Sequence, residues 1–468
     1  MVGDKMDILT QARSIMAMSL SFHIVFASIS MTMPLLMVLA ELRWLRSGRL
    51  TDLKLAKRWQ TATAILFAAG ALSGTILAFE LGMFWPEFMR RAGPIVAIPF
   101  SMESFCFFIE AIFLALYSYG WRYLPRWFHL VCGCIVVLSS WGSAAFITAV
   151  NGWMNTPQGF ELLVDGQWLL RVENFRDLAA LGPAMETTLQ RVFPMEVILN
   201  PSFKSQVSHV ILGSLGAVSF SLASIHAWMI LRDKRVEFHT RALHTVLPVA
   251  IITSILLPIT GDLSARFLAE DQPIKLAAAE AHFETSSHAG LWIGGIANEE
   301  TREVEWGYQI PNVLSIMIGG SPETVVVGLD AVPEENWPNV RIVHGAFQIM
   351  VGCGMVMLLL GLTTLILRLK FGEWTLDKRL LQSWVVCGPL GFIAMQAGWI
   401  VTEVGRQPWV IRHWLRTSEA VATQVNPGPF GITLLCFYLF LSLGIVIFLS
   451  RFVFRPLTIE PLPETHHA

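Results

Sequence analysis

Glu403 is an acidic residue within a segment rich in tryptophan and aliphatic side chains, from Ala397 to Trp409. A charge in hydrocarbon costs roughly 2–3 kcal/mol even on a lenient insertion scale, so an ionisable residue there is a candidate functional residue. A buried carboxylate could bind a metal or carry a proton. The alternative is an ion pair with Arg406, because residues three apart share a helix face.

Other possible ligands also lie within apolar segments. The histidines in such segments are His23, His129, His209, His226 and His344. Each taken alone is more simply explained as a hydrogen-bonded structural histidine, and most of the 19 methionines must be packing residues. Counting about 1.5 Å per residue from the expected outer helix ends, however, places His23, His209, Met350 and Glu403 in the outer third of the membrane. Iron in haem takes such axial ligands, and a histidine–methionine pair gives an electron-transfer site. The pattern predicts two or more haems arranged parallel to the outer surface.

Glu103 and Glu110 form a second pattern. Seven residues apart, they share one helix face and lie about 10 Å apart along the axis. In an apolar bundle such carboxyl groups can pass protons, and the alternative is a pair of buried structural hydrogen bonds. Glu80, expected at the headgroup region, is a weaker candidate.

The elements that position these residues are membrane helices. The chain of 468 residues has 54% apolar and 15% charged residues, whereas soluble domains carry about a quarter charged residues. At about 20 residues per crossing, the apolar stretches predict nine transmembrane helices in an all-α bundle, near 15–40, 60–84, 94–117, 127–150, 206–231, 243–260, 342–367, 382–404 and 429–453. The stretch 243–260 is the shortest because Pro248 and Pro258 interrupt it. The first run lacks a cleavage site and should remain as an anchor.

Basic residues predict the orientation. They collect in three turns, containing Arg43 to Arg58, Arg232 to Arg241, and Arg368 to Arg379. Such turns face the cytoplasm, so we expect the N-terminus outside and the C-terminus inside. Residues 1–468 then form a single membrane domain, with two external segments, 151–205 and 261–340, that could capture substrate.

Cysteines and repeats narrow the function further. All six cysteines fall in apolar runs, which indicates packing residues and no disulfide framework. No Cys-x-x-Cys-His motif occurs, which excludes covalently attached c-type haem. The absence of a visible internal repeat disfavours a transporter built from inverted repeats.

Three motifs resemble subunit I of the cytochrome bd-type quinol oxidases. They are Gly405-Arg406-Gln407-Pro408-Trp409 preceded by Gly398-Trp399 and Glu403; Gly261 to Arg266 with Gln272 to Thr285; and Phe347 to Gly352. Their order and predicted side agree with that family over most of the chain. The resemblance implies a quinol-binding loop beginning in 261–340, of the short-loop class.

The resemblance also implies residue roles. His209 and Met350 would ligate a low-spin haem b, while His23 and Glu403 would ligate one each of the other two haems, in an order left open. Lys275 and Glu280 match quinol-loop residues. The remaining matches are Glu103 and Glu110 in a proton route, with Trp399 and Arg406 beside the haems. Arg406 has the fork of donors that a haem propionate accepts.

Several positions depart from the family pattern. Helix 2 reads Ala78-Phe79-Glu80-Leu81-Gly82-Met83-Phe84-Trp85, which loses one acid and places another two residues later. Gln396 stands where many members have glutamate, and Gln348 where some have arginine. These changes leave two cofactor sets open: two haem b with one haem d, or a third haem b in place of haem d, as in cyanide-insensitive relatives.

The expected protein is therefore a terminal oxidase subunit in a bacterial or archaeal plasma membrane. It would oxidise membrane quinol at the outer face and reduce O₂ to water with cytoplasmic protons. Expected partners are a second large subunit (subunit II) and, in some members, small single-helix subunits, with no nucleic acid. Two alternatives remain from the residues themselves: a proton-coupled transporter without haem, and a haem b electron carrier that does not reduce O₂.

Overall fold

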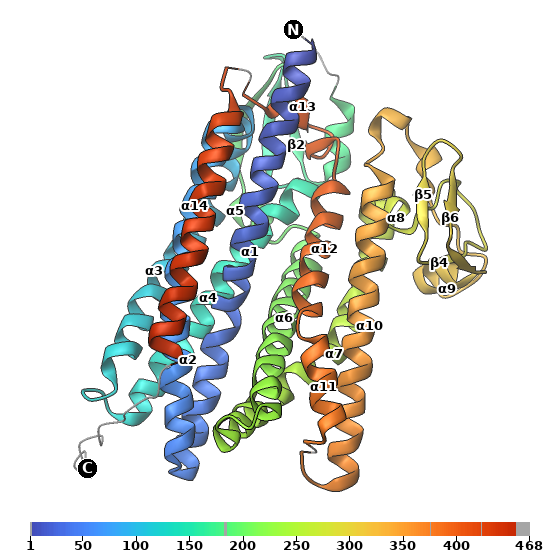
Figure 1. The fold of residues 1–468 in the computed structure, drawn as a ribbon. Coiled ribbons are helices and arrows are strands. Elements are labelled where there is room, and N and C mark those ends of the chain that lie inside the picture. The colour runs from blue at the N-terminus through green and yellow to red at the C-terminus, as the bar shows by residue number, and fades with distance from the viewer. Residues whose placement is uncertain (1, 182–184, 375, 423, 455–468) are drawn as a thin grey trace.

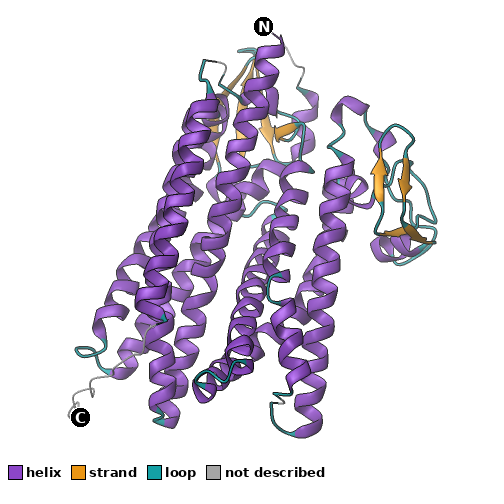
Figure 2. Cartoon of the chain, in the orientation of Figure 1, coloured by secondary structure: helices purple, strands orange, loops and turns teal. Residues whose placement is uncertain are grey.

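Long helices dominate the computed structural model, which describes residues 2–181, 185–374, 376–422 and 424–454. In those residues nine helical spans are long and apolar enough to cross a membrane, which confirms the expected bundle. The helices run roughly parallel, and strands occur only in the connecting segments (Figures 1 and 2). The spans comprise α1 (Val2–Ser47), α2 (Leu50–Phe84), α3 (Pro86–Gly120), α4 (Arg126–Asn155), α6 (Phe203–Leu231), α7 (Val236–Asp271), α10 (Val340–Phe371), α11 (Lys378–Cys387) with α12 (Leu390–Val404), and α14 (Pro427–Phe448).

The chain ends were expected on opposite sides of the membrane. Met1 and residues 455–468 lie outside the described residues. The orientation is therefore taken from the described parts of α1 and α14. α1 begins at one end of the bundle, and α14 finishes at the other with a π-helical turn, Leu449–Val453 (Figure 1). The three basic turns follow α1, α6 and α10. We call the end with these turns the cytoplasmic end, as the distribution of basic residues predicts.

The expected short sixth span was wrong. α7 runs without a break for 36 residues, through both Pro248 and Pro258. Proline removes a backbone donor, but transmembrane helices tolerate it where neighbouring helices support the chain. α7 packs against α6 and α10, which supply that support.

The eighth span, expected at 382–404, is confirmed as a span from Lys378 to Val404, but its helix is interrupted at Gly388 and Pro389, which divide it into α11 and α12. Pro389 lacks an N–H group, so the preceding turn has unpaired carbonyl groups. Ser221 Oγ donates to the Gly388 carbonyl and Ser224 Oγ to the Val385 carbonyl, both at 3.0 Å. A Cβ at Gly388 would lie 2.3 Å from Ser224 Cβ, so the close contact with α6 requires glycine.

Three segments cover the outer end. The segment 151–205, of which residues 182–184 lie outside the described part, folds into β1 (Phe160–Val164), β2 (Trp168–Val172), η1 (Phe175–Ala180), β3 (Thr187–Val192) and α5 (Pro194–Ile198). The sheet is antiparallel with strand order β2-β1-β3. The third segment, 405–426, was not singled out from the sequence; it contains β8 (Trp409–Ile411), β9 (Leu415–Arg416) and α13 (Thr417–Ala420). It packs on the first, with the Phe160 and Trp414 rings stacked at 5.2 Å.

The segment expected as an external loop at 261–340 begins later than expected, because its first residues belong to α7. It contains α8 (Pro273–Glu280), β4 (Leu291–Ile293), β5 (Ile296–Asn298), β6 (Glu303–Glu305), β7 (Tyr308–Ile310), α9 (Val313–Gly319), η2 (Leu329–Ala331) and η3 (Glu334–Asn336). β4 pairs with β7, and β5 pairs with β6. This unit lies beside the outer half of α10 (Figure 1). It therefore folds as a small structured unit and not as an open loop.

Candidate functional site

His23 is held by a hydroxyl group that fixes its tautomer. Its Nδ1 lies 3.0 Å from Ser73 Oγ on α2. Ser73 donates its one proton to the backbone carbonyls one turn earlier on α2. It must therefore accept from His23 Nδ1–H, which leaves the Nε2 lone pair available to a metal. A Cβ at Gly74 would lie 3.0 Å from His23 Cε1, so glycine makes room for the ring.

His209 repeats this arrangement between α6 and α7. Its Nδ1 lies 3.1 Å from Thr260 Oγ1, and Thr260 donates to the Leu257 carbonyl at 3.1 Å. Thr260 therefore accepts from Nδ1–H, and His209 Nε2 is the free nitrogen. A metal-bound histidine in proteins is usually oriented by such a bond to its other nitrogen. When each hydroxyl donates to its own helix, both imidazoles leave Nε2 free, which is the form that can ligate haem iron.

Met350 of α10 faces α12. A Cβ placed on Gly398 would lie 3.0 Å from Met350 Sδ, so the thioether lies against the glycine surface of α12. α12 also packs against α6, the helix that carries His209. Gly398 lies six residues before the end of α12, about 9 Å below its outer end at 1.5 Å per residue. Trp399, the next residue, is partly buried on the same helix.

Glu403 forms the ion pair with Arg406 that the sequence offered as an alternative. Its other oxygen, Oε1, accepts a 2.6 Å hydrogen bond from Asn151 Nδ2 of α4. Each carboxylate oxygen keeps a second lone pair, so this pairing does not exclude metal ligation. The two contacts instead fix the position of the carboxylate.

Arg406 has spare donors. Its side chain is 6% exposed, yet Nε and Nη1 have no hydrogen-bond partner among the described residues. Buried guanidinium donors are rarely left unpaired, because each orphan costs free energy. The two unpaired donors lie on different edges of the guanidinium plane, so each can donate one separate hydrogen bond to an anionic group. These unpaired donors suit an anionic group such as a haem propionate. The Nε2 atoms of His23 and His209 likewise suit haem iron.

A polar chain connects Glu403 to α8. Lys275 Nζ donates to Asn155 Oδ1 at 2.6 Å, and Asn155 Nδ2 donates to the Asn151 carbonyl at 3.0 Å. Asn151 then donates to Glu403. Burial, together with the nearby charge of Arg406, lowers the pKa of Lys275 well below its usual value. Lys275, expected in the quinol loop, and Glu403, expected as a haem ligand, are therefore joined by one chain of hydrogen bonds.

Glu280 ends α8 with a buried carboxyl group. It is 3% exposed, and its Oε2 has no partner among the described residues. Burial raises the pKa of Glu280 to about 8. His344 Nδ1 lies 2.8 Å from the Ala279 carbonyl, which ties the end of α8 to α10.

The glutamines at the family departures have structural partners. Gln348 accepts from the Gly294 N–H at 2.9 Å and donates to the Trp292 carbonyl at 3.0 Å, so it anchors the outer unit to α10. Gln396 donates to the Ser21 carbonyl at 2.8 Å and joins α12 to α1. Each amide therefore replaces a charge with a neutral contact that needs no counter-ion.

The three acids of α2 and α3 are all within the bundle. Glu103 accepts from Ser143 Oγ of α4 at 3.1 Å. Glu110 is 3% exposed, and its Oε1 lacks a partner among the described residues. Glu80 was expected near the headgroups, but it is fully buried and accepts from Ser19 Oγ at 2.5 Å. Glu80 Oε2 also lacks a partner among the described residues, so Glu80 and Glu110 each have a free position for water or a proton.

The other histidines have structural partners. His129 contacts Glu41, and His226 contacts His239 at 2.8 Å between the two Nδ1 atoms. No group of three or more His, Cys, Asp or Glu side chains that could hold a metal ion occurs in the described ranges. One or two ligands per iron are what haem needs, since the porphyrin supplies the other four donors.

Some residues of the site were missed from the sequence. Ser73 and Thr260 orient the imidazoles, and Asn151 and Asn155 connect the acid to α8. Small polar residues in apolar helices are common and usually bond their own backbone, so their type gave no signal. Only the neighbouring helix reveals the second contact.

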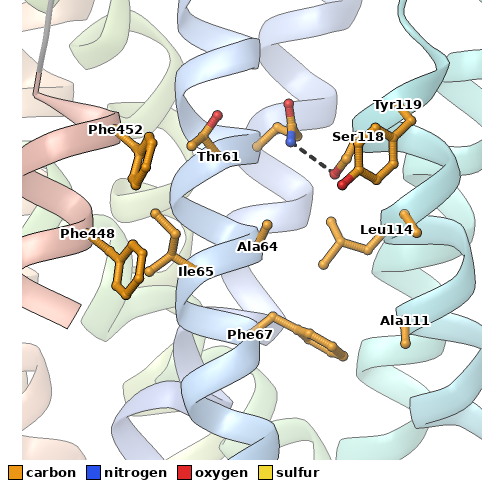
Figure 3. Close-up of a pocket in the computed structure, with 12 residues that line it drawn as sticks. Thr61, Ala64, Ile65, Phe67, Ala111, Leu114, Ser118, Tyr119, Phe448 and Phe452 are labelled. Carbon is orange, nitrogen blue, oxygen red and sulfur yellow. Dashed lines mark hydrogen bonds between the residues drawn. The ribbon is translucent and has the colours of Figure 1, made fainter. Parts of the chain in front are cut away.

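A cavity of about 470 Å³ lies elsewhere, between α2, α3 and the end of α14. Its lining includes Gln60, Leu114, Ser118 and Phe452, and Gln60 Nε2 donates to Ser118 Oγ at 2.9 Å (Figure 3). It contains none of the predicted site residues. The polar site described above is therefore distinct from this mostly apolar cavity.

Comparison with known proteins decides the family. Residues 11–457 match the family described as cytochrome bd terminal oxidase subunit I. The chain belongs to this family. It is 34% identical over 456 residues to the putative cytochrome bd menaquinol oxidase subunit I of Bacillus subtilis (strain 168), covering 96% of this chain and 97% of that protein. It is 28% identical to cytochrome bd ubiquinol oxidase subunit 1 of the same strain, covering 92% and 90%.

A solved structure agrees. The bd oxidase of Geobacillus thermodenitrificans matches with a TM-score of 0.85 and 35% identity, over 95% of this chain and 98% of that one. The chain is thus subunit I of a quinol-oxidising terminal oxidase, a multi-pass membrane protein that carries haem. A second subunit, quinol and O₂ follow from the family. The comparisons favour the oxidase over the transporter and the simple electron carrier.

Proposed function

We propose that this chain binds three haems through His209 with Met350, through His23 and through Glu403, and that it oxidises quinol at the outer end of the bundle. The main support is the matched arrangement of two imidazoles, each held at Nδ1 by a hydroxyl that leaves Nε2 free. His129, by contrast, has both ring nitrogens in hydrogen bonds within the protein. The orphaned donors of Arg406 support a propionate contact.

The cofactor set that we propose is two haem b and one haem d, with a third haem b as the alternative to haem d. The bound haems supply one-electron transfer and reduction of O₂. The assignment of His23 and Glu403 to the second and third haem stays open. The chain itself keeps Glu403 ionised through Arg406 and Asn151, which is the form that an iron ligand needs.

Quinol binding is proposed at α8. Glu280 is buried with a free oxygen and has a pKa raised to about 8, so it can accept a proton from a quinol hydroxyl. Lys275 is a buried donor five residues earlier on α8 that can bond to a quinol oxygen. Its connection through Asn155 and Asn151 to Glu403 supports quinol oxidation close to the proposed haem site. Protons released here leave on the outer side.

Protons consumed by O₂ reduction are proposed to come from the cytoplasm through α3. Glu110 is nearer the cytoplasmic end and Glu103 nearer the outer end, seven residues apart. Ser143 Oγ donates a hydrogen bond to the Glu103 carboxyl group. Glu110 Oε1 has no partner among the described residues, so a water molecule can bind there. Charge separation then arises without a pump, because electrons and protons reach the haems from opposite sides.

The assembly and its location complete the proposal. The chain works with subunit II, and with small single-helix subunits as in some family members, in the plasma membrane of a bacterium or archaeon. The quinol could be of either type that the relatives' names mention. Among the nine spans in the described residues, the one containing α14 has the smallest buried share and α2, α3 and α10 have the next smallest, which leaves room for such partners.

Visible spectroscopy of the purified complex tests the proposal. We expect a Soret band, a low-spin haem b signal, and a second signal that shifts when carbon monoxide binds. A low-spin signal alone would contradict the oxygen-reducing sites. A preparation without a Soret band would contradict haem binding altogether. The position of the red absorption band separates haem d from a third haem b.

A further inference from the structure

A second buried polar cluster lies at the cytoplasmic end of the bundle. It consists of Glu41 of α1, Tyr117 of α3 and His129 of α4, with exposed fractions of 0%, 0% and 2%. His129 Nδ1 lies 2.7 Å from Glu41 Oε1, and the His129 and Tyr117 rings are 4.2 Å apart. We call these three residues the inner cluster. Nothing in the proposed haem or quinol sites uses them.

Hydrogen bonding shows that the Glu41–His129 pair always holds a proton. His129 Nε2 lies 2.8 Å from the Tyr117 carbonyl, which can only accept, so Nε2 carries a hydrogen. The 2.7 Å contact between Nδ1 and Glu41 then needs one further proton, on either the ring or the carboxyl group. Both forms are neutral overall, which suits complete burial. The pair therefore stores one proton that can move between two atoms.

The inner cluster continues the row of acids on α3. Glu103, Glu110 and Tyr117 are spaced by seven residues, so they share one face of the helix at intervals of about 10 Å. The phenol of Tyr117 lies beside the Glu41 carboxyl group. Tyr117, Glu110 and Glu103 therefore form a row that runs from the Glu41–His129 pair toward the outer end of α3.

Unpaired oxygens mark the same line. Glu41 Oε2, Tyr117 Oη and Glu110 Oε1 are all buried without a hydrogen-bond partner among the described residues. Buried polar atoms are normally bonded to protein or to ordered water. Three such oxygens in sequence are places where water molecules would bind and connect Tyr117 to Glu110.

The surroundings of the inner cluster are apolar or uncharged toward the core and basic toward the cytoplasm. Cys132 and Cys134 of α4 are the other titratable groups near Glu41. The Trp121 ring packs on His129 at 4.1 Å, and Lys57 Nζ lies 5.3 Å from the same tryptophan ring. His129 is thus separated from the basic surface by one aromatic layer.

We propose that the inner cluster is the cytoplasmic intake of the proton route of this subunit, a proposal that rests on the proposed oxidase function. A proton from bulk water reaches the Glu41–His129 pair, and the pair passes its stored proton to the Tyr117 oxygen. Tyr117 releases its own hydroxyl proton to water on the way to Glu110. The pair is reprotonated from the cytoplasm, so each residue ends the cycle as it began.

Proton uptake from bulk solvent is the decisive measurement. The purified two-subunit enzyme, fully reduced, is mixed with O₂ beside a pH-sensitive dye. We expect Glu41→Gln to slow proton uptake about 100-fold, the lower end of the range for loss of a positioned proton-transfer group, and Tyr117→Phe to slow it by a smaller factor. The haem spectrum should remain unchanged in both. Glu41→Asp, which keeps the acid, should restore most of the rate.

The matched control is Asp52→Asn. Asp52 is an acid of α2, 1% exposed and bonded to Ser47 near the cytoplasmic end, outside the inner cluster. This variant should take up protons at the wild-type rate. Tyr117→Phe removes one oxygen only, so it decides the question if Glu41→Gln does not assemble.

Two results would overturn the proposal. Wild-type uptake in Glu41→Gln and Tyr117→Phe, with slow uptake in Glu110→Gln, would show that protons reach Glu110 by another path and leave the oxidase function intact. A wild-type complex that consumes no O₂ and takes up no protons would refute both the oxidase function and the intake. Equal slowing in Asp52→Asn would show a general effect of buried acids and would also contradict the role of the inner cluster.

Discussion

The outer site and the inner cluster both bury ionisable residues, but they differ in what is left unpaired. At the outer site the free groups are metal-ligating nitrogens and guanidinium donors, on His23, His209 and Arg406. At the inner cluster both nitrogens of His129 are bonded, and the free atoms are single oxygens. The first set requires a large group that brings iron and negative charge. The second requires only water and protons.

The comparison explains why burial alone does not identify a function. Both regions contain a carboxylate beside a nitrogen base, and both contacts are short. Glu403 is paired with a permanently charged guanidinium, so it stays ionised. Glu41 is paired with an imidazole that can give or take a proton. The partner therefore decides whether an acid holds a metal or relays a proton.

The largest expected effect tests the outer site at its metal ligand. His209→Ala should abolish the low-spin haem signal and quinol-driven O₂ consumption, because no other side chain replaces the imidazole. Thr260→Val should keep the ligand but lose its orientation, with a drop of roughly 10–100-fold in haem affinity. Haem content and spectra measure both. Thr363→Val, an exposed hydroxyl of α10 bonded to its own backbone, is the control and should have no effect. A normal low-spin signal in His209→Ala would refute the ligand assignment.

The next effect tests the link between the two regions. Glu110→Gln should slow O₂ reduction about 100-fold while haem content stays normal, because the amide cannot pass a proton. Stopped-flow measurement of oxygen consumption gives the rate. Ser101→Ala, an exposed hydroxyl of α3 bonded to its own backbone, should behave as wild type. Full turnover in Glu110→Gln would remove α3 from the proton route.

A third effect concerns the orphaned donors at the outer site. Arg406→Gln should weaken haem binding by roughly 10–100-fold, since it removes the donors proposed for the propionate and the partner of Glu403. Haem retention during dialysis measures this. Arg266→Gln is the control, because Arg266 forms an exposed i,i+4 pair with Asp262 and contacts no site residue. Unchanged haem retention in Arg406→Gln would contradict the propionate contact.

The smallest effect is a pH dependence at α8. The pKa of Glu280 is raised to about 8 by burial, so the carboxyl group is protonated below that pH and becomes a base above it. Quinol oxidation limited by this base should rise about tenfold from about pH 7 to about pH 9. Glu280→Gln should flatten the profile and raise the quinol KM, whereas Glu284→Gln, on the exposed part of the same segment, should change neither. A rise that persists in Glu280→Gln would assign it to another group.

Sequence reasoning succeeded for residue types that are rare in hydrocarbon unless they have a function. Glu403, His209 and Met350 stood out because hydrocarbon penalises polar groups, and the nine spans followed from apolar length. The break at Gly388 and Pro389 could not be predicted, since it depends on Ser221 and Ser224 of another helix. The continuity of α7 through two prolines likewise depends on its neighbours.

The site was predicted in its principal residues but not in its connections. The Glu403–Arg406 pair was foreseen from spacing along one helix. The contacts of Asn151 and Asn155 join residues more than one hundred positions apart, and no periodicity reports them.

The sequence by itself determined that this chain is a membrane bundle and which residue types are available for chemistry, because the cost of charge in hydrocarbon acts on each residue separately. The tertiary structure alone decided which hydroxyl sets each imidazole tautomer, and which partner keeps each acid ionised or lets it exchange protons. Those properties depend on distances of about 3 Å between different helices. Such distances exist only once the helices have packed.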